Sequence, residues 1–168
     1  MSGDQNKPLV DVVAPSGARF AIVWSRFNHA VVGKLLEGAT KCFAQHGVNN
    51  EAVYVVEVPG AWELPYASQK LAQSGKFDAV VALGAVIRGG TPHFDYVSEG
   101  TALGLGRVSL DTGVPVVFGV LTTDDDAQAL DRAGGAHGNK GHDAALTAIE
   151  MTLFDRKLAD DGITTQRP

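Results

Sequence analysis

Short apolar runs alternate with longer amphipathic stretches along most of the 168 residues, and this alternation is the strongest constraint on the fold. The clearest runs cover residues 19–24, 52–58, 78–83 and 115–121. Strands of a parallel sheet are nearly continuous in apolar residues, because helices cover both faces of the sheet. The sequence therefore predicts an α/β protein, a three-layer α/β/α sandwich around a four-stranded parallel sheet.

The stretches between and after the runs predict helices over residues 28–46, 61–74, 93–110, 124–133 and 139–158. Asn28 is suited to the N-cap position of the first helix. The third helix contains Gly100, Gly104 and Gly106, and each glycine costs a helix about 1 kcal/mol relative to alanine. The four-residue spacing of Gly100 and Gly104 indicates a face pressed closely against a neighbouring element.

The length suits one domain over residues 1–168, with an N-terminal arm at 1–17, a core at 18–158 and a tail at 159–168. The arm is polar except for an apolar patch at residues 9–13. This patch fits a flexible tail, and it equally fits a strand that adds to the sheet of a neighbouring subunit.

Composition argues against several classes of protein. The net charge of -5 gives no general attraction for nucleic acid or for an anionic membrane. Cys42 is the single cysteine, so the chain forms no internal disulfide and a reducing compartment is expected. The first residues lack the apolar core of a signal peptide, and no run approaches the roughly 18 residues of a membrane span. We expect a cytoplasmic protein.

The strand-to-helix connections of a parallel sheet all lie at one edge, where ligands bind. This edge is expected to gather the segments 24–28, 59–63, 84–93 and 118–123. These segments carry three aromatic rings, a carboxylate, a histidine and glycine-flanked amides: Phe27, Trp62, Phe118, Glu63, His93 and residues 89–91. Aromatic faces beside polar groups suit a flat heterocycle, and exposed amides at a helix start suit a phosphate.

Standard nucleotide and metal signatures fail in this sequence. A dinucleotide fingerprint beginning at Gly104 would need glycine at position 109, where Ser109 stands. The glycine-rich stretch 134–141 has Asn139 before its lysine and no hydroxyl residue after it, unlike a triphosphate-binding loop. The histidines lack a cysteine or acidic partner at the usual ligand spacing, so no metal site is predicted. Cys42 is interpreted as a packing residue.

Five motifs follow one another in order along the predicted core. They are Ser25-Arg26-Phe27-Asn28, the octapeptide 58–65, the dodecapeptide 84–95, the hexapeptide 118–123, and Arg132-Ala133-Gly134 followed by Gly138-Asn139-Lys140-Gly141. Together they resemble the 6,7-dimethyl-8-ribityllumazine synthase family, which has a flavodoxin-like fold. Each motif alone is weak, whereas five in register across residues 19–158 are specific. His142-Asp143 departs from the family pattern and leaves open how a carboxylate meets Lys140 or Arg132.

The resemblance implies a reaction of riboflavin biosynthesis. 5-Amino-6-(D-ribitylamino)uracil condenses with 3,4-dihydroxy-2-butanone 4-phosphate to give 6,7-dimethyl-8-ribityllumazine, with release of phosphate and water, and no cofactor or metal takes part. The resemblance assigns proton transfer to His93. It also assigns uracil and ribityl contacts to Phe27, Ala61, Trp62, Glu63, Ala85, Val86, Ile87 and Phe118, and phosphate contacts to Gly90, Thr91, Arg132 and Lys140.

The resemblance further implies a homo-oligomer, a pentamer or an icosahedral shell of sixty subunits, with active sites between neighbouring subunits and riboflavin synthase as a candidate partner. Phe118, Arg132 and Lys140 could then belong to the subunit next to the one that supplies His93. The alternative function is a non-catalytic flavodoxin-like module that binds a flavin or a lumazine. Such a module would keep Phe27 and the glycines without needing His93 and Arg132 together.

Overall fold

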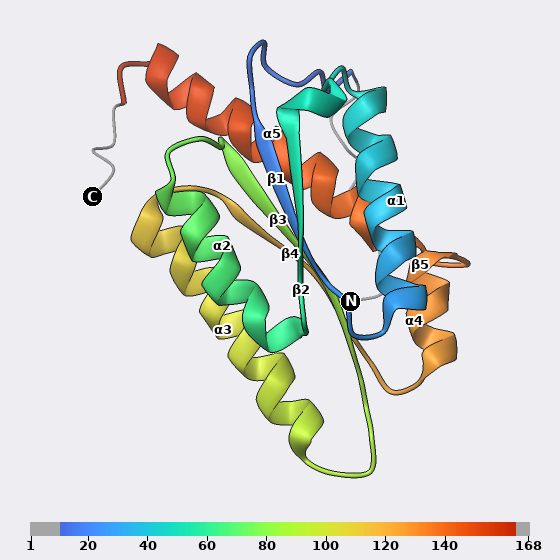
Figure 1. Cartoon of the computed structure of the whole chain (residues 1–168). Coiled ribbons are helices and arrows are strands. Elements are labelled where there is room, and N and C mark those ends of the chain that lie inside the picture. Colours follow the sequence, from blue (N-terminus) through green and yellow to red (C-terminus); the bar gives the residue numbers. More distant parts are fainter. Residues whose placement is uncertain (1–10, 164–168) are drawn as a thin grey trace.

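The computed structural model describes residues 11–163 and shows a sheet with helices on both faces (Figure 1). Its four strands are β1 (Phe20–Ser25), β2 (Val53–Val58), β3 (Ala79–Ile87) and β4 (Val116–Thr123). All neighbouring strands pair in parallel, in the order β2-β1-β3-β4. The predicted three-layer α/β sandwich with a flavodoxin-like parallel sheet is confirmed.

Five α-helices cover the sheet: α1 (His29–Gln45), α2 (Leu64–Gln73), α3 (His93–Thr112), α4 (Asp126–Arg132) and α5 (Lys140–Asp160). Helices α1 and α5 pack together on one face, and α2 and α3 pack together on the other (Figure 1). Alternate residues of each strand point to opposite faces. Phe20 and Ile22 of β1 therefore enter the core under α1 and α5, whereas Ala21 and Val23 enter the core under α2 and α3.

The spacing of Gly100 and Gly104 predicted that α3 packs closely against a neighbouring element, and the structure shows this contact. A Cβ atom on Gly104 would lie 2.7 Å from Cγ of Pro65 in α2, and one on Gly100 would collide with the ring of Trp62. Gly106 faces open space. Two of these three glycines therefore allow α3 to approach its neighbours, which outweighs their low helix propensity.

The Gly-Asn-Lys-Gly motif joins α1 to α5. Asn139 is the N-cap of α5, where its Oδ1 accepts hydrogen bonds from the amides of Gly141 (2.9 Å) and His142 (3.2 Å). Its Nδ2 donates to the Lys34 carbonyl oxygen at 2.9 Å. A Cβ atom on Gly141 would collide with the backbone of Leu35. At least these two residues of the motif serve the helix crossing rather than a phosphate loop.

Several predicted boundaries were wrong. Strand β3 runs to Ile87 instead of ending at Leu83, because β4 continues to pair with it up to Thr123. The 3₁₀ turns η1 (Asn50–Ala52) and η2 (Ala61–Glu63) precede β2 and α2, so the second helix begins at Leu64. Helix α4 begins at Asp126 instead of residue 124, and Asp125 caps it by accepting from the Gln128 amide at 2.8 Å. The short strands β5 (Ala133–Gly135) and β6 (Gly138–Asn139) form an antiparallel pair that the sequence analysis did not predict.

The predicted N-terminal strand at residues 9–13 lies partly outside the described residues. Residues 9 and 10 lie outside the described residues, and residues 11–13 are not a strand in this chain. Val12 is buried, and its carbonyl oxygen lies 2.6 Å from Nδ1 of His46 just after α1. The Ala14 amide donates to the His46 carbonyl oxygen at 3.0 Å. This part of the arm therefore packs against the end of α1.

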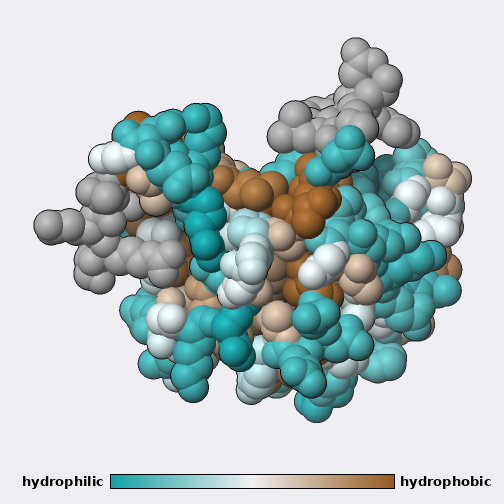
Figure 2. Space-filling view, turned by 90° about the horizontal axis from the view of Figure 1, so that it is seen from above, coloured by the Kyte–Doolittle hydropathy of each residue, from teal (hydrophilic) through white to brown (hydrophobic). Residues whose placement is uncertain are grey.

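The molecule leaves large hydrophobic side chains exposed. One face has a hollow in which hydrophobic residues gather between hydrophilic ridges (Figure 2). Across the described residues, exposed hydrophobic side chains include Tyr54 and Val55 on the edge strand β2, Phe118 on the edge strand β4, and Leu103 and Leu110 on α3. Among the helices at residues 11–163, none is both long and apolar enough to cross a membrane.

Candidate functional site

The carboxyl ends of β1, β2 and β3 open into one cavity of about 700 Å³. Nine of the residues that the sequence analysis selected line this cavity: Phe27, Ala61, Trp62, Glu63, Ala85, Val86, Ile87, Thr91 and His93. They come from the three strand-to-helix connections after β1, β2 and β3, from the last residues of β3 and from the start of α3. Residues of these three connections therefore lie together at one edge of the sheet, as expected for parallel strands.

Backbone hydrogen bonds fix the connection that carries Phe27. The amides of Arg26 and Phe27 donate to the carbonyl oxygens of Val58 (2.8 Å) and Pro59 (3.0 Å), which continues the pairing of β1 with β2 past the strand end. Asn28 then takes a left-handed conformation with φ 60°, and 71% of Phe27 stays exposed. The aromatic ring is held at the rim of the cavity by its backbone.

Asn28 stands at the N-cap position, as predicted, but its side chain does not cap α1. Its Nδ2 instead donates to the Ala85 carbonyl oxygen at 2.9 Å. The side chain thus bridges the β1 connection to β3. A side chain that bonds across the cavity floor cannot also reach the first amides of α1, which explains the difference from the prediction.

The end of β3 presents free backbone to the cavity. Strand β1 pairs with β3 only as far as Leu83, whereas β4 pairs with it through Ile87. Residues 85–87 consequently have a strand neighbour on one side and the cavity on the other. The backbone N–H and C=O groups on that side are available to a ligand, apart from the Ala85 oxygen that Asn28 occupies.

Helix α3 positions the η2 turn, which carries Trp62 and Glu63. The Thr101 hydroxyl, itself buried, donates to the Ala61 carbonyl oxygen at 3.1 Å. The Trp62 ring lies against Gly100, yet 60% of Trp62 remains exposed. The Glu63 carboxylate lies next to Gly60, where a Cβ atom would stand 3.2 Å from Oε2. The turn therefore has a fixed backbone and offers a ring and a carboxylate to the cavity.

Arg88 clamps the connection between β3 and α3. Its guanidinium forms ion pairs with Asp124 (3.1 Å) and Asp95 (3.3 Å) and stacks over the Phe94 ring with its Cζ 4.1 Å from the ring centroid. These contacts give Arg88 a structural role. A Cβ atom on Gly89 or Gly90 would meet no heavy atom within 4 Å, so their backbone is accessible.

His93 is the first residue of α3 and faces the cavity. Its amide lies 3.4 Å from the Thr91 hydroxyl oxygen, which it can reach as a donor. Within the described residues its imidazole has neither a hydrogen bond nor an ion pair. The ring nitrogens of His93 are therefore free to accept or donate a hydrogen bond to a bound ligand.

Three predicted site residues lie away from this cavity, and Gly90 lies beside it on the exposed loop. Phe118 is the third residue of β4, so it lies well before the connection that follows Thr123. With Lys140 it lines a second cavity along the open edge of β4. Arg132 ends α4, where its guanidinium donates to the Gln128 carbonyl oxygen at 3.1 Å. The expectation that Phe118 joins the other connections within one chain was therefore wrong.

Lys140 has its carboxylate partner in Asp143. Its Nζ lies 2.8 Å from Oδ2 of Asp143, so an ion pair already compensates the lysine charge. Among the described residues Arg132 forms no ion pair. The two cations that the sequence analysis grouped together thus differ in their availability to a phosphate.

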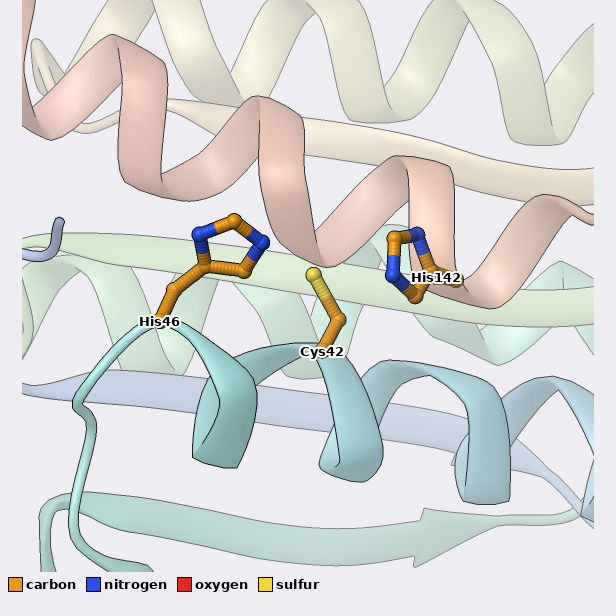
Figure 3. Close-up of side chains that lie close together, drawn as sticks. All are labelled: Cys42, His46 and His142. Carbon is orange, nitrogen blue, oxygen red and sulfur yellow. The ribbon is translucent and has the colours of Figure 1, made fainter. Parts of the chain in front are cut away.

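Sequence reasoning overlooked a cluster between α1 and α5. The potential ligand atoms of Cys42, His46 and His142 all lie within 4.8 Å of one another (Figure 3). Burial, with a smaller contribution from the negative charge of Asp143, raises the pKa of the Cys42 thiol to about 12. The four-residue spacing of Cys42 and His46 on one helix was a detectable signal, whereas nothing local in the sequence pointed to His142.

Two comparisons with known proteins agree with each other. A family model described as "6,7-dimethyl-8-ribityllumazine synthase" matches residues 17–156. A protein of Chlorobium luteolum (strain DSM 273 / BCRC 81028 / 2530) named "6,7-dimethyl-8-ribityllumazine synthase" is 49% identical over 154 residues. That alignment covers 92% of this chain and 99% of the relative.

Proposed function

The chain belongs to the 6,7-dimethyl-8-ribityllumazine synthase family, and from this premise we propose which of its residues carry out the reaction. It is an enzyme with lumazine synthase activity in riboflavin biosynthesis. The family's substrates are 5-amino-6-(D-ribitylamino)uracil and 3,4-dihydroxy-2-butanone 4-phosphate. The alternative of a binding module without catalysis loses its support with this membership. The convergence of nine selected residues on one cavity carries the proposal for the site.

The uracil ring is proposed to stack on Phe27, with its polar edge along residues 85–87. The exposed Phe27 ring supplies an apolar face at the rim, and the unpaired edge of β3 supplies alternating donors and acceptors. A flat heterocycle with several amide-like groups satisfies both surfaces at once. Backbone groups of a sheet cannot rotate away, so the edge also fixes the orientation of the ring.

The ribityl chain is proposed to lie along the η2 turn. Residues 61–63 line the cavity next to the end of β3. A carboxylate accepts hydrogen bonds only, and the hydroxyl groups of a sugar alcohol donate them. Glu63 is therefore the residue suited to hold ribityl hydroxyls, while Trp62 covers the chain.

The phosphate of the second substrate is proposed to bind at residues 90–91. The Gly90 amide is open to solvent, and Thr91 adds a hydroxyl at the start of α3. The first amides of a helix have no partners within the helix and favour an anion. Arg132 is the better cationic partner, because Asp143 already pairs with Lys140.

His93 is proposed to move protons between the two bound substrates. The condensation requires imine formation between an amine of the uracil and the ketone, elimination of phosphate, and ring closure. Each step needs a proton delivered or removed, and none changes the oxidation state of a cofactor. A histidine beside both the phosphate segment and the ring segment is placed for these transfers.

The second half of the site is proposed to come from a neighbouring subunit. In one chain Phe118 and Lys140 line the open edge of β4, apart from the cavity that holds His93. A head-to-tail ring of subunits would bring the β4 edge of one copy against the β3 end of the next. The exposed hydrophobic side chains of β4 and α3 would then be covered. We propose that this ring is the pentamer that the family resemblance implies, either alone or as part of a shell.

The change of His93 to alanine tests the catalytic assignment. The imidazole makes no contact that supports the fold, so His93→Ala should leave the thermal unfolding midpoint unchanged. It should lower kcat about 10²- to 10⁴-fold, the usual contribution of a general acid or base. Lumazine absorbance measures the rate with both substrates present. His137→Ala, which removes an exposed histidine outside the cavity, is the matched control, and an unchanged kcat in His93→Ala would exclude His93 from proton transfer.

A further inference from the structure

Cys42, His46 and His142 form a set of potential metal ligands outside the active-site cavity. Cys42 and His46 extend from the last turn of α1 and the residue after it, and His142 extends from the first turn of α5. In Figure 3 the sulfur points toward α5, and a ring nitrogen of each histidine is turned toward it from either side. None of the three lines the cavity at the carboxyl ends of the strands.

The second nitrogen of each histidine has a different partner. Nδ1 of His46 lies 2.6 Å from the Val12 carbonyl oxygen, and a ring N–H at this position would donate to it. Nδ1 of His142 lies 3.9 Å from a carboxylate oxygen of Asp143. Each contact leaves Nε2 as the free nitrogen. In histidines that bind metals, the other nitrogen is typically held by a carbonyl or carboxylate oxygen. His46 follows this rule, whereas the contact between His142 and Asp143 is longer than a hydrogen bond and leaves the His142 ring free to turn.

The donor set selects the class of metal. One thiolate and two imidazoles suit Zn²⁺, whereas Mg²⁺ and Ca²⁺ require oxygen ligands. Tetrahedral zinc with bonds of about 2.0–2.3 Å holds its ligand atoms roughly 3.3–3.6 Å apart. The observed atoms lie within 4.8 Å of one another, so a contraction of about 1 Å completes the geometry. His142 is 36% exposed at its side chain, and rotation of this ring can supply the movement.

An entry path for an ion also exists. His142 lines a surface cavity together with Gly38, Lys41 and Gln45 of α1. An ion can reach the free nitrogen of His142 through this cavity, and a water molecule there can serve as a further ligand. The buried thiol would be the last ligand to bind.

We propose that Cys42, His46 and His142 bind one Zn²⁺ ion per chain, which ties α1 to α5 with water as the fourth ligand. Binding exchanges the thiol proton for the metal: Cys42–SH and Zn²⁺ give a Cys42–S–Zn bond, and the proton leaves to solvent. The site is structural. It joins the two helices of one face and, through His46 and Val12, the beginning of the described chain.

The full-length protein, stripped of metal by dialysis against a chelator, provides the test. After addition of Zn²⁺ and gel filtration, atomic emission should find one zinc per chain, and the thermal midpoint should rise with zinc but not with Mg²⁺. With Co²⁺ as the probe, a thiolate-to-cobalt charge-transfer band should appear. The proposal is overturned if no zinc is retained, or if bound Co²⁺ shows no thiolate band.

Variants separate this site from adventitious binding. His142→Gln changes a partly exposed ring and should weaken zinc binding at least tenfold with the fold intact. Cys42→Ser should abolish the cobalt band. His137→Ala, in an exposed histidine–aspartate pair, should bind zinc as the unchanged protein does. Equal zinc affinity in His142→Gln would overturn the proposal even if Cys42→Ser failed to fold, as would loss of binding in His137→Ala, which would identify a surface site.

Discussion

Phe27 keeps 71% of its surface in water, although its amide and that of Arg26 donate hydrogen bonds to Pro59 and Val58. Folding of one chain gains little from such a ring, whereas a stacked heterocycle would bury it. Aromatic stacking on a base is worth about 1–3 kcal/mol. Phe27→Ala should therefore raise the KM for the uracil substrate about 5- to 150-fold with almost no change in the unfolding midpoint.

Tyr66 provides the matched control for this prediction. It is 68% exposed on α2 and lines none of the cavities described above. Tyr66→Ala should leave the KM for the uracil substrate unchanged. An equal rise in KM for the two variants, measured by initial rates of lumazine formation, would contradict stacking on Phe27.

Arg132 and Lys140, the two cationic candidates for binding the phosphate, differ in their ion pairing. Arg132 has no ion pair within the described residues, whereas Lys140 lies 2.8 Å from Asp143. A charge-assisted bond contributes about 1.5–3 kcal/mol, so Arg132→Ala should raise the KM for the butanone phosphate by roughly 10- to 150-fold. Lys140→Met should raise this KM less than about fivefold, because it mainly removes an exposed ion pair. The reverse order in steady-state titrations would contradict the assignment.

The motifs predicted which residues are candidates for the site, but only part of their arrangement in space. The three connections after β1, β2 and β3 met as the sheet-edge rule requires. The Asn28 side chain bonds to the carbonyl oxygen of Ala85, which is far away in sequence, instead of capping α1. The pairing of Lys140 with Asp143 depended on how α5 begins. Local pattern carries no information on either contact.

At the scale of elements, the glycines of α3 show how packing overrides propensity. A Cβ atom at Gly104 would lie 2.7 Å from Pro65, whereas Gly106 faces open space on the same helix. Gly106→Ala should stabilise the protein by about 1 kcal/mol through helix propensity alone. Gly104→Ala should lose about 1–3 kcal/mol through overpacking against α2.

The pair of variants forms its own control, since both substitutions add one methyl group to α3. Chemical denaturation at one protein concentration gives the two free energies of unfolding. If Gly104→Ala proved as stabilising as Gly106→Ala, the close contact between α2 and α3 would not exist.

Element types were predictable from periodicity, and element ends were not. The apolar run of β3 loosens into glycine after Leu83, which predicted a loop, yet β4 keeps the backbone extended to Ile87. This extension shapes the cavity, because residues 85–87 reach past β1 and expose one backbone edge to it. Hydrogen bonding to a partner strand, rather than side-chain pattern, decides where such a strand ends.

At the scale of the whole molecule, one chain carries the proposed site residues on two separate surfaces. His93 and the residues proposed to bind the ring face one cavity, and Phe118 and Lys140 face another along the β4 edge. Such a division, together with an exposed edge strand, is what a site shared between subunits requires. Composition and periodicity describe a single chain and could not reveal this division of the residues between two surfaces. The clearest structural sign of the division is the set of exposed hydrophobic residues on β4 and α3.

The most direct test of a shared site mixes two defective proteins and assays them at a butanone phosphate concentration far below the KM of Arg132→Ala, where each variant alone is expected to be nearly inactive. His93→Ala and Arg132→Ala subunits are unfolded, combined in equal amounts and refolded together, and lumazine formation is compared with each variant refolded alone. If His93 and Arg132 act from neighbouring subunits, random assembly restores both groups in about a quarter of the sites, and activity should return to about a quarter of the unchanged enzyme. If both groups act within one chain, every site keeps a defect, and activity no higher than that of the separate variants would contradict the account.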